Sequence, residues 1–89
     1  MISKDFTISN KLGLHARPSA QLTQVASRFA ADIHIAKGIR RVNAKSIMGV
    51  MMLAAGCGAV VTIDAAGADE ADAVAALGEL IASGFGEGE

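Results

Sequence analysis

The chain has 89 residues, 52% of them hydrophobic, which is enough for one small core, so we expect a single domain over residues 1–89. The net charge of −1 hides an asymmetry: residues 1–45 carry all eight basic residues and two acids, a balance of +6, whereas residues 46–89 carry seven acids and no base. Only three aromatic residues and one cysteine are present, so we expect no nucleic-acid partner, no disulfide, no metal site and no cofactor.

The first elements follow from hydrophobic periodicity. Residues 2–9 alternate between apolar and polar side chains, which predicts a half-buried strand. Charges at positions 4 and 5 and the lack of an apolar stretch argue against a secretory signal, and the single cysteine fits a reducing compartment, so we expect a cytoplasmic protein. A helix is predicted over 16–29, because its apolar residues recur at helical spacing (Leu22, Val25, Ala26 and Phe29). Pro18 suits the first turn of a helix, where the amide that proline lacks would have no partner. We therefore expect this helix to begin directly after His15.

Two short strands, 32–37 and 40–44, are predicted to form a hairpin. Gly38 stands first in the two-residue turn between them, as a type II′ turn requires. This register pairs Ile35 with Val42. It also places four apolar residues on one face, so the turn and the hydrophobic pattern agree: Ile33, Ile35, Val42 and Ala44.

Residues 46–63 form an uncharged run of 18 residues, which approaches the length of a membrane span. Three glycines interrupt this run, so we expect no membrane insertion. The run predicts instead a helix over 47–54, capped by Ser46 and ended by glycines, and a strand over 59–65. Inward positions of the strand are Val61, Ile63 and Ala65.

Within the predicted helix at 47–54, Ile47, Val50 and Met51 are expected in the core, and Met48 is expected to be exposed and available to partners.

The last predicted helix follows Asp69, a suitable N-cap, and its core positions are Ala73, Val74, Leu77, Leu80 and Ile81. Gly78 should weaken this helix by roughly 1 kcal/mol relative to alanine, and residues 84–89 are expected to fray. The order of elements is β-α-β-β-α-β-α. It predicts an α+β fold, an open-faced β-sandwich in which three helices cover one face of a four-stranded antiparallel sheet.

The segment that can carry chemistry is Gly-Leu-His-Ala-Arg-Pro at residues 13–18. It places an imidazole, that of His15, at the N-terminus of a helix, where unpaired amides and the helix dipole favour anions. The same dipole disfavours imidazolium, which leaves a ring nitrogen available as a nucleophile. A phosphoryl group on this nitrogen would meet Arg17 and the backbone amides together. The residues alone thus allow a phosphoryl relay or, more simply, a histidine that caps a helix.

This segment resembles the active-site signature of HPr, the histidine-containing phosphocarrier family of the phosphoenolpyruvate-dependent phosphotransferase system. A second stretch, Asn-Ala-Lys-Ser-Ile-Met-Gly-Val-Met at residues 43–51, resembles the regulatory serine region of the same family. The length and the predicted order of elements also match the family. The resemblance therefore covers the whole chain.

The resemblance implies that His15 accepts a phosphoryl group from enzyme I through Nδ1 and passes it to an enzyme IIA domain. It implies that Arg17 neutralises the phosphate and that the amides of Ala16 and Arg17 hold it. The protein would carry the group as a monomer and would not be a turnover catalyst. Ser46 would be the site that an ATP-dependent HPr kinase/phosphorylase modifies. The partner interface would comprise Ala16, Arg17, Ala20, Ile47, Met48 and Met51.

Two other functions remain open. A carrier of the nitrogen-related phosphotransferase chain would share His15 and serve regulation, although the Lys-Ser-Ile-Met-Gly setting of Ser46 favours the sugar type. A small ligand-binding α/β module is the alternative from another class, and the setting of His15 argues against it. His34 is expected to be a solvent-side strand residue, and Cys57 a small turn residue.

Overall fold

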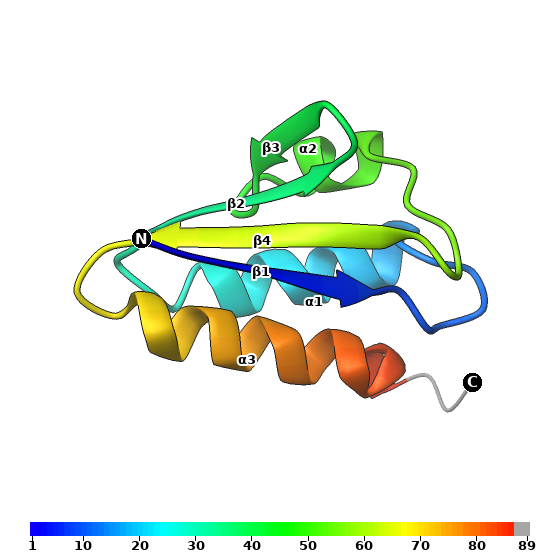
Figure 1. Ribbon diagram of the computed structural model, residues 1–89. Helices are drawn as coiled ribbons and strands as arrows, with labels where there is room; N and C mark the ends of the chain where they lie inside the picture. The colour runs from blue at the N-terminus through cyan, green and yellow to red at the C-terminus, as the bar shows by residue number, and fades with distance from the viewer. Residues whose placement is uncertain (87–89) are drawn as a thin grey trace.

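Four strands form one antiparallel sheet in the computed structural model, which describes residues 1–86 (Figure 1). Across the sheet they lie in the order β1 (Ile2–Thr7), β4 (Val60–Ala66), β2 (Asp32–Lys37) and β3 (Arg40–Asn43). Each neighbouring pair is antiparallel. The last strand in the chain, β4, is therefore a central strand that joins β1 to the β2–β3 hairpin.

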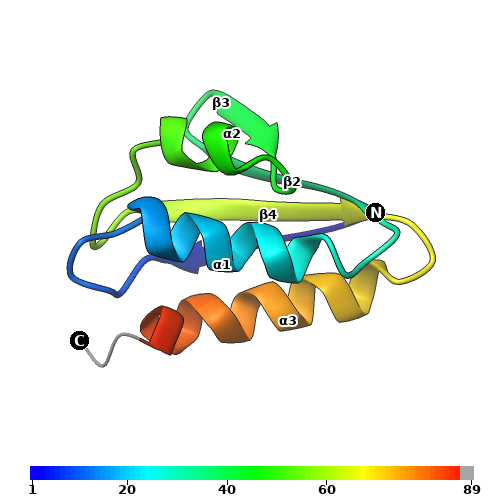
Figure 2. The ribbon, with the colours of Figure 1, turned by 180° about the vertical axis from the view of Figure 1, so that it is seen from behind.

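Three helices complete the fold: α1 (Ala16–Ala26), α2 (Ile47–Met52) and α3 (Glu70–Ala82). Both ribbon views show α1 and α3 side by side on the same face of the sheet (Figures 1 and 2). The short helix α2 contacts α1 and β3. This arrangement confirms the predicted α+β open-faced sandwich.

The sheet directs its predicted apolar residues into the core. Val61, Ile63 and Ala65 on β4 are fully buried, and Ile35 pairs with Val42 as the hairpin register requires. Gly38 takes a positive φ of 61°, the conformation that the predicted turn needs from its first residue. Alternation along the strands therefore identified the buried face correctly.

Two helices end earlier than their apolar patterns suggest. The first ends at Ala26 and not at residue 29, because the next amides bond three residues back: Arg28 N–H to the Val25 carbonyl and Phe29 N–H to the Ala26 carbonyl. Helix α2 ends at Met52, and the left-handed residue that follows it is Ala54, with φ of 52°, where a glycine was expected.

The expectation that Ile47 and Met51 belong to the core is wrong, since their exposed fractions are 40% and 39%. Helix α2 has six residues and lies at the rim of the helical layer, where it contacts α1 on one side and β3 on another. Val50 is the one residue of this helix that is buried. Met48 is 67% exposed, as expected.

Helix α3 begins where predicted, but the Asp69 side chain makes no capping hydrogen bond to its own helix. Its carboxylate accepts the backbone N–H groups of Ala30 (2.8 Å) and Ala31 (2.9 Å), which lie at the entrance to β2. These hydrogen bonds, that from Ala30 foremost, hold the pKa of Asp69 below its ordinary value. Asp69 thus links the start of α3 to residues 30 and 31, which connect α1 to β2.

We expect Asp69→Asn to lower the thermal stability at neutral pH more than Asp72→Asn, a charge-matched change in the first turn of the same helix. A carboxyl group whose pKa is depressed on folding stabilises the fold above its unfolded pKa of about 3.9, and this contribution is lost as the pH falls through the folded pKa. The deficit of Asp69→Asn should therefore shrink below about pH 4. Thermal unfolding followed from about pH 7 to 2.5 measures it, and a deficit that is the same at both ends contradicts the assignment.

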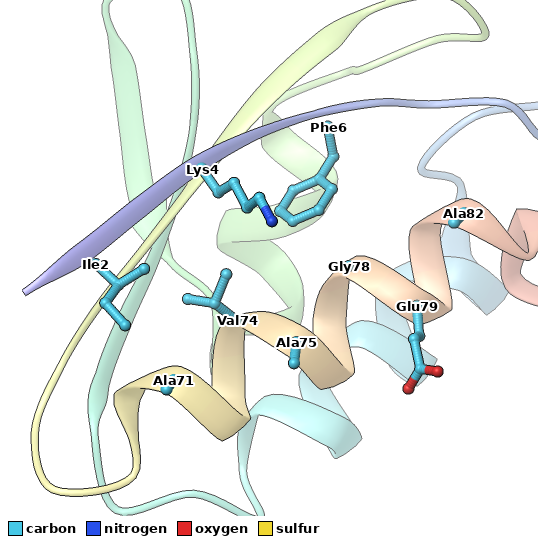
Figure 3. Close-up of a pocket in the computed structure, with 9 residues that line it drawn as sticks. All are labelled: Ile2, Lys4, Phe6, Ala71, Val74, Ala75, Gly78, Glu79 and Ala82. Atoms are coloured by element: carbon cyan, nitrogen blue, oxygen red, sulfur yellow. The ribbon is translucent and has the colours of Figure 1, made fainter.

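Gly78 has a packing role that its helix propensity does not reveal. A Cβ atom at this position would lie 2.6 Å from Cε1 of Phe6 on β1. Figure 3 shows the Phe6 ring directed at α3 over this glycine, beside a groove that Ile2 and Val74 also line. The missing side chain lets α3 approach the sheet closely.

The expected fraying of residues 84–89 is wrong for the first part of this segment. Gly84–Gly86 forms a tight turn whose residues have positive φ, and Phe85 is 2% exposed within the core. Residues 87–89 lie outside the described part of the chain. Burial of one large aromatic side chain anchors the end of α3, which polar composition alone did not indicate.

Candidate functional site

The loop before α1 is fixed by close contact with the segment that precedes β4. Gly13 has a φ of 66°, and a Cβ atom there would lie 2.3 Å from the Ala55 carbonyl oxygen and 2.7 Å from Cα of Gly56. The next amide, that of Leu14, donates to the same Ala55 carbonyl at 2.8 Å. Only glycine fits at residue 13, because the position combines a left-handed backbone with no room for a side chain.

His15 follows this contact as the N-cap residue of α1, in the extended conformation (φ −80°, ψ −170°). Its backbone carbonyl accepts the Ser19 amide at 3.0 Å, but its imidazole makes no capping hydrogen bond. The simpler interpretation of the sequence, in which this histidine caps the helix, is therefore wrong. His15 is half-buried.

The groups that would receive an anion lie next to His15. The amides of Ala16 and Arg17 belong to the first turn of α1 and have no acceptor within the helix, because the first intrahelical bond comes from Ser19. Both residues are exposed. A phosphoryl group beside His15 would therefore meet backbone N–H donors, the positive end of the helix dipole and the nearby guanidinium of Arg17.

An apolar surface adjoins this end of the molecule. Helices α1 and α2 pack against each other, and α2 presents four hydrophobic side chains that are 39–67% exposed. On α1, Ala16 is exposed and Ala20 is half-buried. We call this the α1–α2 surface, and its residues are Ala16, Ala20, Ile47, Met48 and Met51.

Ser46 borders the α1–α2 surface and caps α2 as predicted. Its backbone is extended, and its hydroxyl oxygen accepts the Gly49 N–H at 3.2 Å. The hydroxyl is thus at the surface and at the positive end of a short helix.

The basic residues of the first half do not form the single surface that their sequence clustering suggested. Arg41 points from the sheet face opposite the helices and holds Asp64 in two hydrogen bonds of 2.7 and 3.1 Å, which raise the pKa of Arg41. Lys45 Nζ donates to the Phe29 carbonyl at 2.8 Å. Arg41 and Lys45 therefore make contacts within the fold. Alternation along β3 sets the direction of Arg41, and the loop after β3 sets that of Lys45.

His34 and Cys57 stay apart from this site. His34 is half-buried on the sheet, with Nδ1 3.8 Å from the Asp64 carboxylate, so its surroundings are less open than expected. Cys57 is exposed in a turn, as expected. Among residues 1–86, no group of three or more His, Cys, Asp or Glu side chains could hold a metal ion, and no helix is long and apolar enough to cross a membrane.

Sequence reasoning missed two buried polar residues beside His15. The side chains of Asn10 and Ser19 are fully buried, and each donates to a carbonyl of the loop: Asn10 Nδ2 to Gly13 at 2.7 Å and Ser19 Oγ to Leu14 at 3.2 Å. The one sign of this burial in the sequence was that both polar residues stand in the segment between two core residues, Ile8 and Leu22.

The sheet topology and the histidine at the N-terminus of the first helix are those expected of a small phosphocarrier domain. The family model for the HPr component phosphorylation site of the phosphotransferase system matches residues 2–83. The chain belongs to this family, the HPr phosphocarrier proteins.

Relatives match over the full chain. Phosphocarrier protein HPr of Cupriavidus necator is 57% identical, and that of Neisseria meningitidis serogroup B is 53% identical, each over 89 residues that cover 100% of both chains. The crystal structure of HPr-C-His from Thermoanaerobacter tengcongensis superposes with a TM-score of 0.95 at 49% identity and covers 98% of each chain. HPr from Bacillus anthracis superposes with a TM-score of 0.87 at 48% identity, covering 90% of this chain and 95% of that one.

Proposed function

We propose that His15 accepts a phosphoryl group from enzyme I of the sugar phosphotransferase system and passes it to an enzyme IIA domain. The observation that carries this assignment is the position of His15: it is the N-cap residue of α1, directly before the Ala16 and Arg17 amides that have no acceptor within the helix. Membership of the HPr phosphocarrier family supports the same role. The site needs no cofactor, because the imidazole itself holds the group.

The transfer step balances as a displacement at phosphorus. A bond forms between Nδ1 of His15 and phosphorus while the donor's bond to phosphorus breaks, and the electron pair of that bond leaves with the donor. The amides of Ala16 and Arg17, the helix dipole and the Arg17 guanidinium stabilise the charge on the phosphoryl oxygens. The same step in reverse, with an enzyme IIA group as nucleophile, empties the carrier. The chain is thus a transfer intermediate in the cytoplasm and not a turnover catalyst.

The α1–α2 surface, together with Arg17, is the proposed docking site for both partners. Its exposed methionines can adapt to more than one surface, which suits a carrier that binds a donor and an acceptor in turn. We infer a monomer, because this surface must be free for each partner. Solved structures of relatives include an HPr dimer from Thermoanaerobacter tengcongensis, with a TM-score of 0.79. Sedimentation analysis at micromolar concentration decides between the two states.

Mass spectrometry after incubation with enzyme I and phosphoenolpyruvate tests the proposed function. We expect a gain of one phosphoryl group that is lost in acid, because a phosphoramidate is acid-labile. No gain would favour the small ligand-binding module. Enzyme I of the sugar chain and that of the nitrogen-related chain, tested side by side, distinguish the two branches by their transfer rates.

Ser46 is the proposed regulatory site for an HPr kinase/phosphorylase. Ser46→Ala should cost about 1 kcal/mol of stability, because it removes the acceptor of the Gly49 amide. Ser46→Asp should be no less stable than the parent chain, because a carboxylate can cap the helix and gains from its dipole. Urea denaturation of the two variants measures the difference, and an equal loss in both contradicts the capping role.

The same aspartate should slow acceptance from enzyme I, since it adds a negative charge beside the docking site, where the exposed cation Arg17 would fit an acidic partner surface. The penalty should shrink as salt is raised. Binding titrations at low and high ionic strength measure it, with Ser46→Ala as the uncharged control. Unchanged affinity of Ser46→Asp at low salt removes the electrostatic switch.

A further inference from the structure

Two of the three buried polar or charged residues among residues 1–86 lie beside His15. Asn10 and Ser19 have exposed fractions of 0%, and Asp64 is the third at 6%. Burial of a polar side chain is unfavourable unless each group finds a partner, and an apolar residue could fill the same space. The buried amide of Asn10 and the buried hydroxyl of Ser19 therefore fix the conformation of this loop more than they add to the stability of the fold.

Their hydrogen bonds hold three consecutive carbonyl groups. Gly13 O accepts Asn10 Nδ2 at 2.7 Å and the His15 N–H at 2.9 Å. Leu14 O accepts Ser19 Oγ at 3.2 Å, and His15 O accepts the Ser19 N–H at 3.0 Å. In addition, the Gly13 N–H donates to the Asn10 carbonyl at 3.1 Å. Each carbonyl group from residue 13 to residue 15 therefore accepts at least one hydrogen bond, which restrains the backbone of this segment.

The bond from the His15 N–H to Gly13 O closes a three-residue γ-turn around Leu14. Such a turn is a weak restraint by itself, because its hydrogen bond is short in sequence and poorly aligned. Asn10 Nδ2 donates to the same carbonyl oxygen from within the core, and this second hydrogen bond fixes the orientation of the Gly13 carbonyl group. The orientation of the Gly13 carbonyl group sets that of the His15 backbone. It therefore also sets the position of the imidazole relative to the α1 amides.

We propose that Asn10 is a positioning residue for phosphoryl transfer, which acts by clamping the Gly13 carbonyl and thereby orienting His15. This inference rests on the proposed function of His15. Asn10 is fully buried, so it is not available to contact a docking partner. Its loss should therefore lower the rate of transfer in the bound complex and leave the affinity for enzyme I unchanged.

The decisive variant is Asn10→Asp, which replaces the donating amide with an oxygen of nearly the same shape. A carboxylate facing Gly13 O repels it, so we expect kcat for transfer from enzyme I to fall about tenfold or more with KM unchanged. Asn10→Ala should give a smaller loss, because the His15 N–H still reaches Gly13 O. Val74→Ala, a core truncation in α3, is the control for lowered stability alone. Equal losses of kcat in Val74→Ala and Asn10→Asp, or wild-type kcat in a folded Asn10 variant, overturn the proposal.

Protonation provides a rescue within the same variant. A protonated carboxyl group regains a donor, and burial favours its protonated form at a higher pH than at the surface. The NMR signal of the His15 amide in Asn10→Asp should approach its wild-type position as the pH falls. Comparison with the wild type at each pH removes the changes that are common to both proteins. A chemical-shift difference that stays constant down to about pH 3 contradicts the clamp.

The unsubstituted protein offers a test that does not depend on a variant's folding. The side-chain NH₂ protons of Asn10 should exchange with water at least tenfold more slowly than those of Asn43, whose residue is exposed. Equal exchange rates overturn the clamp. If the wild type takes no phosphoryl group from enzyme I, the proposed function fails first. If it does and Asn10→Asp transfers equally fast, only the role of Asn10 fails.

Discussion

His15→Ala should abolish phosphoryl acceptance while leaving the fold intact. The residue is half-buried and lies outside the hydrophobic core, so its loss should change the free energy of unfolding by less than about 1 kcal/mol. Intact-mass measurement after incubation with enzyme I should show the parent mass only. The matched control is His34→Ala, which removes the other histidine and should still gain one phosphoryl group. A phosphoryl gain on His15→Ala would show that another residue is the nucleophile.

Gly13→Ala should be strongly destabilising and should also slow transfer. The added methyl group meets the Ala55 carbonyl at 2.3 Å on a backbone with φ of 66°, so the His15 loop must move away from the residue 55–56 segment. Left-handed backbone and overpacking together should cost about 3 kcal/mol. Urea denaturation measures this loss, and single-turnover transfer from enzyme I measures the displacement of His15.

Gly38→Ala separates the two causes. Its φ of 61° is nearly the same, but no atom lies within 4 Å of the added Cβ. It should therefore cost only about 1 kcal/mol and leave the transfer rate unchanged, since the β2–β3 turn is not part of the site. Equal destabilisation of Gly13→Ala and Gly38→Ala would mean that the contact with Ala55 is unimportant.

Local patterns predicted most of the fold because the restraints involved are themselves local. The alternation that buries Ile63, the glycine-first turn at Gly38 and the proline at the start of α1 each act within a few residues. The misses involve partners that are distant in sequence. Asp69 bonds to amides 38 and 39 residues away, and Gly78 is required by a phenylalanine on β1.

The same distinction applies to the site. Pro18 was enough to place His15 at the N-terminus of α1, and Ser46 was recognisable as a cap from its neighbours alone. Periodicity could not reveal that α2 lies at the rim of its layer, which leaves Met51 exposed. Nor could it reveal that Asn10 turns inward to the Gly13 carbonyl, because a loop has no repeating pattern to indicate direction.

The central position of β4 has a consequence for synthesis of the chain. Val60–Ala66 is the partner of β1 and also of β2, so a nascent chain that lacks it holds β1 without any neighbouring strand. The sheet can close only after residue 66 has left the ribosome. About three-quarters of the polypeptide must therefore emerge before β1 finds a partner strand. The His15 loop, which needs Ala55 and the β1–β4 pairing beside it, becomes competent only at that late stage.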